Sequence, residues 1–395
     1  MFPLSMFLSK LIKYGTLNII DTKGKTHTFF GTHEPSVTIR FKDASLLWKL
    51  FFWPDLKAGE AYMDGTLTIE SPHDVYDFLY LITKNMEWRP NNPFHLMGGD
   101  PYSRFKGWFN QINWPGKSKS NVAHHYDLSD DLYDLFLDDN RQYSSAYFHS
   151  SDETLEQAQL NKMNLIAKKL FLNDHQNVLD IGCGWGGLSR YLNKVSGANI
   201  TGVTLSEEQL KVAAKNTLEN EHVNFRLQDY RDITETFDRV VSVGMFEHVG
   251  RKQYQTFFNK VYDCLNEDGI ALIHTIGRAD GPGETDPWTK KYIFPGGYAP
   301  SLSEIAPVIE KSGLYITDME VLRLHYANTI SEWRKRVDCN KDKIIELYDD
   351  RFLRMWEFYL ASAECAFRNL GHVVFQFQLA KKQENAPLHR HYLSE

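Results

Sequence analysis

The sequence predicts an α/β protein: a doubly wound sheet with helical insertions, preceded by a small α+β domain. β-branched apolar runs alternate with helix-length amphipathic segments from residue 177 onward, as in parallel sheets wrapped by helices on both faces. The first of these runs ends in a glycine-rich turn, VLDIGCGWGG. A stretch rich in Pro, Gly, Asn and Ser separates this region from the N-terminal one.

Residues 1–95 are expected to form the α+β domain. Short strands with turns are predicted for THTFFGTHEPSVTIRF, and mixed helical periodicity follows over 43–86. The N-terminal MFPLSMFLSKLIKYG has the spacing of a short amphipathic helix, which rests either on its own domain or on a lipid surface. Its lysines follow the apolar residues, so a signal peptide is not favoured.

Residues 96–120 are expected to be a linker, and residues 121–395 the catalytic domain. An acidic helix is predicted for DLSDDLYDLFLDD. Strands are predicted for NVLDIG, ANITGVT, VNFRLQ, FDRVVSVG and GIALIHTIG. Helices near 186–195, 206–219 and 251–265 separate these strands. The C-terminal third is predicted to begin with a helix at SLSEIAPVIEKSG and a strand at LYITDMEVLRL. A long helical region over 331–370 and a last strand at HVVFQFQL follow.

Composition excludes several classes of protein. The net charge of -7 argues against a nucleic-acid protein. Four scattered cysteines without CxxC spacing indicate neither a zinc site nor a disulfide framework, which favours a reducing, cytoplasmic setting. No apolar run is long enough for a membrane-spanning helix. The 14% aromatic content suits either a large apolar ligand or an aromatic-rich core.

The glycine loop points to a particular cofactor. Gly182, Gly184 and Gly187 satisfy the G-x-G-x-x-G pattern of dinucleotide-binding proteins. A nicotinamide enzyme would also carry an acidic residue about 20 positions on, where this chain has a Thr-Leu-Ser run. The acid lies earlier, at Asp180, where it suits the cationic S-adenosylmethionine.

The LDIGCGWG arrangement is typical of class I methyltransferases, and two later loops agree with that fold. TLSEEQ follows the second strand, where Ser206 and Gln209 form a possible capping box, and QDYRD follows the third. In open α/β sheets, loops at the carboxyl ends of the strands bind the ligand.

Seven motifs in order resemble one family. The motifs are NVAHHYDLSDDLYDLFLDDNRQYSSAYF, VLDIGCGWGGL, GVTLSEEQ, VSVGMFEHVG, LIHTIG, YIFPGG and HYANT. Together they are similar to those of the cyclopropane-fatty-acid-phospholipid synthases, whose relatives include the mycolic acid cyclopropane synthases. The likeness covers about residues 121–380, and GEAYMDGTLTIE resembles the extra N-terminal domain of the phospholipid enzymes.

The resemblance implies transfer of a methylene group from S-adenosylmethionine to the cis double bond of unsaturated phospholipid acyl chains. It implies a methylated carbocation, which bound bicarbonate deprotonates before the ring closes. It also implies a lipid-binding or dimerising N-terminal domain, a homodimer, and a cytoplasmic enzyme peripherally associated with the inner face of the membrane.

The site residues are carried over from the same resemblance. The expected cofactor-binding residues are Tyr143, Ser144, Asp180, Gly182, Gly184, Thr204, Leu205, Gln209, Gln228, Asp229 and Tyr230. The expected catalytic residues, which hold the bicarbonate, are Glu247, His274, Ile276, Tyr326 and Ser145. Glu247 is expected to accept the bicarbonate hydroxyl proton, because an ionised carboxylate only accepts.

The chain departs from the family pattern at two cysteines. Ser145 replaces one and keeps a hydroxyl, while Ala363 replaces another and Cys365 lies two residues away. A thiol nucleophile is therefore not expected. The adjacent His124 and His125 are read as structural or wall residues, and no metal site is expected.

Three other functions remain open. The glycine loop also suits an enzyme that stops at a methyl-branched or methylenated chain, and one that methylates a small amine. A lipid-binding or lipid-transfer protein with a vestigial cofactor site is the alternative outside enzymes.

Overall fold

The computed structural model describes residues 2–86, 128–219 and 221–393, which form two compact units. One unit comprises residues 1–104, 285–295 and 330–371, and the other comprises residues 105–284, 296–329 and 372–395. Residues 285–295 and 330–371, predicted to lie in the catalytic domain, thus pack with the N-terminal segment. The linker predicted over 96–120 and the pair His124 and His125 lie outside the described residues.

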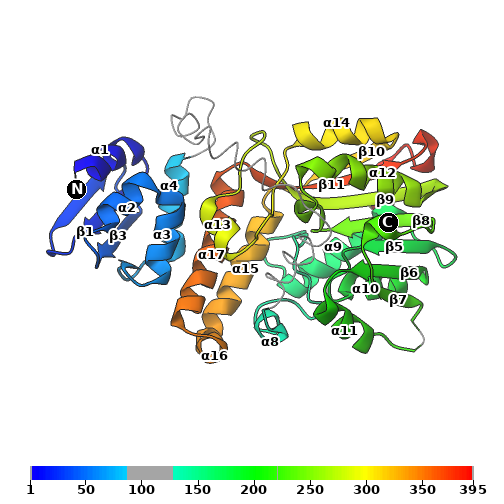
Figure 1. The fold of residues 1–395 in the computed structure, drawn as a ribbon, viewed down its shortest axis with the longest axis horizontal. Coiled ribbons are helices and arrows are strands. Elements are labelled where there is room, and N and C mark those ends of the chain that lie inside the picture. Colours follow the sequence, from blue (N-terminus) through cyan, green and yellow to red (C-terminus); the bar gives the residue numbers. More distant parts are fainter. Residues whose placement is uncertain (1, 87–127, 220, 394–395) are drawn as a thin grey trace. The chain divides into compact units, whose positions relative to one another are not determined.

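The unit that holds the N-terminus contains a four-stranded sheet in the order β2-β1-β3-β4 (Figure 1). β1 runs parallel to β3, and the other two pairings are antiparallel. The strands are β1 (Thr16–Ile20), β2 (Thr26–Phe30), β3 (Ser36–Phe41) and β4 (Leu67–Ile69), and the helices are α1 (Phe2–Leu11), α2 (Leu46–Phe52), α3 (Pro54–Met63) and α4 (Val75–Met86). The described part of this segment thus contains both strands and helices.

Helix α1 packs against its own domain. Leu4, Leu8 and Leu11 recur at helical spacing and are each about 5% exposed. They join Leu17 and Ile19 of β1 in one hydrophobic core. Of the two positions considered for this segment, the structure therefore shows the one on its own domain.

Later parts of the chain complete this unit. It also contains α13 (Pro287–Tyr292), α16 (Lys341–Leu347), α17 (Asp350–Asn369) and most of α15 (His325–Cys339). Trp288 of α13 is 1% exposed, and its indole Nε1 lies 3.2 Å from Met63 Sδ. Gly59 allows this contact, because a Cβ there would lie 2.5 Å from the Trp288 Nε1. The long helical region predicted over 331–370 is divided into three helices.

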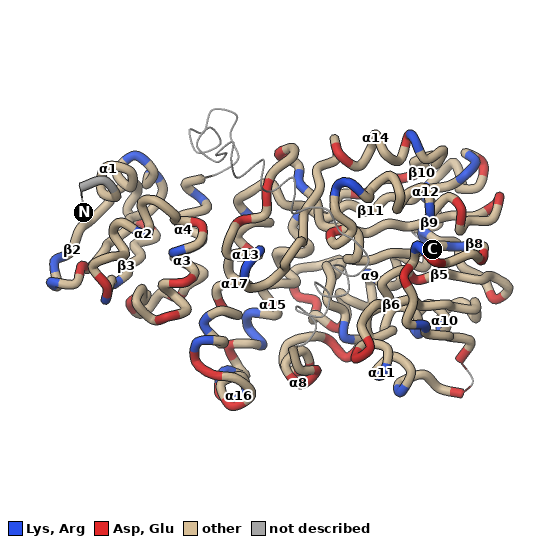
Figure 2. Tube along the Cα trace, in the orientation of Figure 1, with Lys and Arg blue, Asp and Glu red and all other residues tan. Residues whose placement is uncertain are grey.

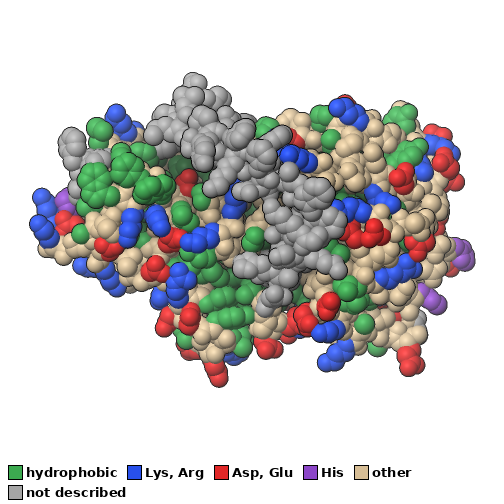
Figure 3. Space-filling model, in the orientation of Figure 1, with side chains coloured by type: hydrophobic (Ala, Val, Ile, Leu, Met, Phe, Trp, Pro, Cys, Tyr) green, Lys and Arg blue, Asp and Glu red, His purple; other side chains and the backbone are tan. Residues whose placement is uncertain are grey.

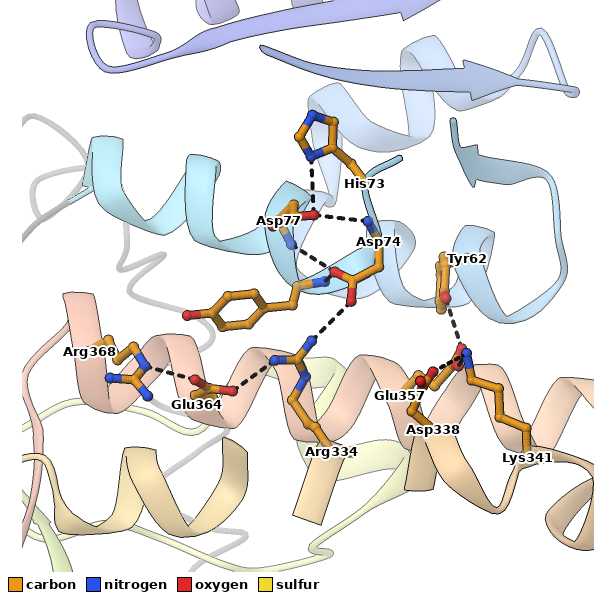
Figure 4. A network of polar contacts seen from close by, with 11 residues as sticks. Tyr62, His73, Asp74, Asp77, Arg334, Asp338, Lys341, Glu357, Glu364 and Arg368 are labelled. Carbon is orange, nitrogen blue, oxygen red and sulfur yellow. Dashed lines mark hydrogen bonds and ion pairs between the residues drawn. The ribbon is translucent and has the colours of Figure 1, made fainter. Parts of the chain in front are cut away.

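Ion pairs and hydrogen bonds join these helices around two carboxylates (Figure 4). Glu364 of α17 accepts from Arg334 at 3.0 Å and from Arg368 at 2.7 Å, and Arg334 also reaches Asp74 at the start of α4. Glu357 accepts from the Tyr62 hydroxyl at 2.9 Å. Since Glu364 is 1% exposed, its two guanidinium partners are needed to offset the loss of water.

The second unit is built on a seven-stranded sheet in the order β10-β11-β9-β8-β5-β6-β7 (Figure 1). The pairings from β9 to β7 are parallel, and β11 is antiparallel to both of its neighbours. The strands are β5 (Asn177–Ile181), β6 (Asn199–Thr204), β7 (Val223–Leu227), β8 (Phe237–Val243), β9 (Leu265–Arg278), β10 (Tyr315–Val321) and β11 (His372–Ala380). Every strand predicted after residue 177 is confirmed.

Helices cover both faces of this sheet, as the alternating pattern predicts. One core cluster contains residues of α12 (Tyr254–Cys264) and α14 (Leu302–Ser312), and the other contains residues of α9 (Leu155–Leu170) and α10 (Gly187–Ser196). α11 (Glu207–Lys215) follows β6. Within the described residues of the acidic segment DLSDDLYDLFLDD, the helix is the short α8 (Asp130–Asp134), capped by the Ser129 hydroxyl.

The surface charge is mixed. Figure 2 shows acidic and basic residues interspersed along both units. No helix within the described ranges has both the length and the apolarity needed to cross a bilayer.

Candidate functional site

Several of the predicted site residues of the second unit lie at or near the carboxyl ends of its parallel strands. The glycine loop follows β5, the segment Thr204–Gln209 follows β6, and Gln228 follows β7. Glu247 comes just after β8, and His274 of β9 pairs with Val243, the last residue of β8. Because neighbouring parallel strands end at the same edge of a sheet, these residues lie along one edge of this sheet.

The glycine loop has the open backbone that a bound ligand requires. Gly182 and Gly184 have φ of +82° and +56°, a region that favours glycine. A Cβ at Gly182 would lie 2.8 Å from Met245 Cβ, whereas a Cβ at Gly184 would meet no atom of the described residues within 4 Å. The described part of the chain therefore leaves space beside Gly184.

The loop after β6 orients one amide. The Thr204 hydroxyl donates to Gln209 Oε1 at 3.1 Å, which leaves the NH2 group of Gln209 as a donor. Ser206 Oγ accepts from the Gln209 N–H, so half of the predicted capping box is present. The other half is not formed, because the Gln209 side chain turns to Thr204 and the Ser206 N–H donates to the Thr204 hydroxyl. Leu205 between them is half-buried.

The loop after β7 is held by its own side chains. The Asp229 carboxylate accepts from the Arg231 guanidinium at 2.9 and 2.6 Å, and Gln228 donates weakly to the Asp232 carbonyl. The Tyr230 ring packs edge-to-face on Phe257. Arg231 therefore neutralises the one acidic residue predicted for cofactor binding in this loop.

A buried lysine organises the segment that carries Tyr143, Ser144 and Ser145. Lys162 of α9 donates to the Gln142 side-chain oxygen at 2.5 Å and to the Ser144 hydroxyl at 2.9 Å. The Tyr143 ring lies against the rings of Tyr133 and Phe136, and the Ser145 hydroxyl donates to the Ala146 carbonyl. These contacts fix the segment next to α9.

Lys162 also sets the charge balance near the glycine loop. Burial lowers the pKa of Lys162 to about 8, and the nearby Asp138 and Asp180 oppose that shift. Burial raises the pKa of Asp180 to about 6, although the Ser189 hydroxyl donates to its carboxylate at 2.6 Å. Asp180 thus links β5 to α10 and is a poorly solvated anion, which a nearby cation would stabilise.

Glu247 presents one satisfied and one unsatisfied oxygen. Its Oε1 accepts from the Ile276 backbone N–H at 2.6 Å, and its buried Oε2 has no hydrogen-bond partner among the described residues. Burial raises the pKa of this carboxyl to about 7. A buried carboxylate oxygen without a hydrogen bond costs free energy, so the site favours a ligand that donates a hydrogen bond to Oε2. The Ile276 N–H, expected to bind the anion, is directed to Glu247 in this structure.

His274 is nearly inaccessible, with 2% exposure, and its Nδ1 lies 3.0 Å from Gln376 Nε2 of β11. Tyr326 is 7% exposed in the first turn of α15. That turn is attached to the segment after Ser145, because Thr329 Oγ1 accepts from the Ala146 N–H and His325 Nδ1 accepts from the Phe148 N–H.

Three polar residues of the site were not found by motif matching: Lys162, Gln159 and Gln376. All three are at most 1% exposed. Gln159 donates to the carbonyls of Gln142 and Ser144. Their signal in the sequence is a polar residue at a position that the apolar periodicity assigns to the core, as in AQLNKM.

The residues present fit S-adenosylmethionine. Gly184 leaves room at the carboxyl edge, Gln209 offers an amide donor, and Asp180 supplies negative charge close to the loop. The strand order, with the antiparallel β11 inserted beside β9, and this loop define a class I methyltransferase.

Comparison with known proteins places the chain within that class. Residues 115–377 match the family described as mycolic acid cyclopropane synthetase, and the chain belongs to this family. It is 42% identical over 349 residues to the cyclopropane-fatty-acyl-phospholipid synthase of Escherichia coli K12, which covers 88% of each chain. It is 35% identical to a probable fatty acid methyltransferase of Pseudomonas putida, over 84% of each.

Solved structures agree. The cyclopropane synthase MmaA2 from Mycobacterium tuberculosis has a TM-score of 0.63 at 33% identity, covering 67% of this chain and 98% of its own. The mycolic acid cyclopropane synthase CmaA1 complexed with SAH and CTAB has a TM-score of 0.62 at 32% identity, covering 66% and 97%. The chain is an S-adenosylmethionine-dependent methyltransferase.

Proposed function

We propose that this methyltransferase converts cis double bonds of unsaturated phospholipid acyl chains into cyclopropane rings. The observation that carries the proposal is Glu247, whose buried Oε2 has no donor among the residues that the structure describes, at the edge of the sheet where the methyl group would be transferred. Identity of 42% to a cyclopropane-fatty-acyl-phospholipid synthase over 88% of both chains supports the lipid substrate.

S-adenosylmethionine, when bound, supplies an electrophilic methyl group to the alkene. The alkene π electrons form the new C–C bond as the methyl–sulfur bond breaks, the bonding pair stays on the sulfur of the departing S-adenosylhomocysteine, and the acyl chain becomes a methyl-bearing cation. Loss of one proton from that methyl group then leaves the electron pair that closes the ring. The protein must keep water away from the cation and place a base near the methyl group.

Bicarbonate is proposed as that base, held by this chain's own groups. Glu247 Oε2 accepts the bicarbonate hydroxyl proton, while His274 and Tyr326 donate to its oxygens. Ser145 contributes its backbone N–H, because its hydroxyl already donates to the Ala146 carbonyl. The predicted roles of Tyr143, Ser144, Asp180, Gly182, Gly184, Thr204, Leu205, Gln209, Gln228, Asp229 and Tyr230 in holding S-adenosylmethionine stay predictions.

The proposed reaction is tested by incubating the protein with S-adenosylmethionine and vesicles of a cis-unsaturated phospholipid. Acyl chains heavier by one CH2, with upfield ring protons and no vinyl protons, are the expected product by mass spectrometry and proton NMR. The same added mass with vinyl protons retained indicates transfer without ring closure. No added mass, although S-adenosylmethionine binds, contradicts the lipid substrate.

A thiol has no part in this proposal, and the structure supports that view. Cys365 of α17 is fully buried, and burial raises the pKa of its thiol to about 12. At neutral pH it is therefore protonated and unreactive. We expect Cys365→Ala to keep wild-type turnover in the vesicle assay. Lost turnover in a variant with a native circular dichroism spectrum contradicts this.

The N-terminal unit is proposed to contact the membrane surface as a peripheral, lipid-presenting domain. Figure 3 shows hydrophobic side chains on its surface. An exposed aromatic cluster consists of Trp48, Phe51, Phe52 and Trp53, which are 38 to 60% exposed. Exposed Trp and Phe favour the interface between lipid and water. The predicted homodimer stays a prediction.

Replacing both Trp48 and Trp53 with Ser is expected to weaken binding to phospholipid vesicles by roughly tenfold or more, because less apolar area leaves water. Co-sedimentation at fixed lipid concentration measures the change. Tyr315→Ser, which removes a 47% exposed aromatic ring from the other unit, is the matched control. Equal binding by the double variant and the control contradicts the lipid contact.

A further inference from the structure

His274 faces a glutamine across two paired strands. His274 of β9 and Gln376 of β11 are directly opposite one another in the antiparallel register. His274 Nδ1 and Gln376 Nε2 lie 3.0 Å apart, and the two residues are 2% and 1% exposed. Because both side chains are buried away from water, neighbouring groups determine which nitrogen of the His274 ring carries the hydrogen.

Lys169 decides how the glutamine amide is oriented. Its Nζ lies 2.7 Å from Gln376 Oε1 and also contacts the Glu320 carboxylate. Burial lowers the pKa of Lys169, and the Glu320 carboxylate opposes that shift and so stabilises the ammonium form. An ammonium group only donates, so the amide oxygen must face Lys169. The amide NH2 group therefore faces His274 and donates to Nδ1. The hydrogen of the neutral ring is then on Nε2.

The ring is also kept neutral. Burial, together with the nearby cations Lys162 and Lys169 of α9, holds the pKa of His274 well below its usual range. Within the part of the chain that the structure describes, Nε2 makes no hydrogen bond. A single N–H donor is thus left for whatever binds beside the ring.

We propose that Gln376, oriented by Lys169, is a positioning residue that fixes His274 in the tautomer with its hydrogen on Nε2, so that this nitrogen donates to the anion of the active site. The identity of that anion rests on the proposed function; the tautomer does not. In the other tautomer, Nε2 would direct a lone pair at the anion and repel it.

The tautomer is measured by NMR of the full-length protein labelled with ¹⁵N-histidine, and the His274→Asn spectrum identifies the His274 signals. We expect the wild-type ring to show a hydrogen on Nε2 and no titration between about pH 6 and 8. A hydrogen on Nδ1, or a ring that titrates in this range, overturns the proposal.

The substitution Gln376→Glu tests whether Gln376 sets the tautomer of His274. A carboxylate between Lys169 and His274 has no hydrogen to donate, so Nδ1 must become the donor. The ring is expected to change tautomer or to become doubly protonated. Gln378→Glu is the matched control, because Gln378 lies on the same buried strand and bonds to the Lys169 carbonyl and Thr317 instead. An unchanged Nε2–H signal in Gln376→Glu overturns the proposal.

Should the buried charge prevent folding, Gln376→Met and Gln378→Met make the same comparison without charge. Gln376→Met is then expected to give mixed tautomers, and a ring that keeps its hydrogen on Nε2 alone overturns the proposal. In the vesicle assay, Gln376→Glu is expected to lower kcat by about 10²-fold or more with the KM for S-adenosylmethionine unchanged. Because the NMR readout needs no turnover, failure of the proposed reaction is distinguished from failure of this inference.

Discussion

Glu247→Gln is expected to lower kcat by about 10²- to 10⁴-fold while leaving the dissociation constant for S-adenosylmethionine nearly unchanged. The glutamine retains an oxygen for the Ile276 N–H, which now bonds to Glu247 Oε1 at 2.6 Å. The position of the Glu247 Oε2 atom, however, is then taken either by the amide NH2 group, which donates, or by the uncharged amide oxygen. Bicarbonate then loses the acceptor for its hydroxyl proton, and proton removal from the substrate slows.

Vesicle assays for kcat and calorimetry for cofactor binding measure the two effects separately. Glu267→Gln is the matched control, since Glu267 is on β9 and its side chain is 70% exposed. A Glu247→Gln variant with wild-type kcat contradicts the proposed base-holding role. If cofactor binding is lost as well, the effect is on the fold of the loop and not on proton removal.

The pH dependence of Glu247 gives a second signature. Burial raises the pKa of the folded carboxyl from 4.5 to about 7, so the ionised form appears as pH rises through about 7. At constant bicarbonate concentration, kcat should rise through this range in the wild type and not in the glutamine variant. Between the two pKa values the native state binds more protons than the unfolded state, so stability falls as pH rises. The glutamine variant should lack that fall in the free energy of unfolding.

Lys162→Met is the second substitution with a large expected effect. We expect the dissociation constant for S-adenosylmethionine to rise at least about tenfold, and the free energy of unfolding to fall by about 2–4 kcal/mol. Lys162 is fully buried, and its ammonium holds both the Gln142 amide and the Ser144 hydroxyl. Without it, these two groups lose their donor and the negative charges of Asp138 and Asp180 lose their nearby cation.

Calorimetry with S-adenosylmethionine and urea unfolding check this expectation. Lys168→Met makes the same change in charge on the same helix, at a partly exposed position whose contact is a 3.4 Å hydrogen bond to the Leu393 carbonyl. Wild-type cofactor affinity in Lys162→Met would show that the Tyr143–Ser145 segment keeps its place without this lysine.

Periodicity was enough to predict the sheet, because alternating apolar strands and amphipathic helices have only a few ways to bury their faces. It was not enough for the helices over 331–370, whose apolar faces could pack on any partner of suitable shape. Their packing with the N-terminal segment depends on pairs far apart in sequence, such as Arg334 with Asp74. No local pattern encodes such a pair.

The same limit applies to the site. Motifs mark Glu247, His274 and the glycine loop as candidates, and the parallel strands that carry them end at the same edge of the sheet. Lys162 and Gln376 were missed, since each appears in the sequence as a single polar residue in an apolar segment. Their importance comes from partners 18 or more positions away, at Ser144 and His274.

The interleaving of the two units has a consequence for synthesis on the ribosome. The chain alternates between them, with residues 1–104, 285–295 and 330–371 in one and the remainder in the other. The N-terminal unit therefore does not have all of its helices until α17 has emerged. β11, which carries Gln376, follows only after that, within the last 24 residues of the chain. The core of the second unit includes Phe375 and Phe377 of β11, so it is completed only after α17 has been made. A product that ends before β11 would also lack Gln376, the partner of His274.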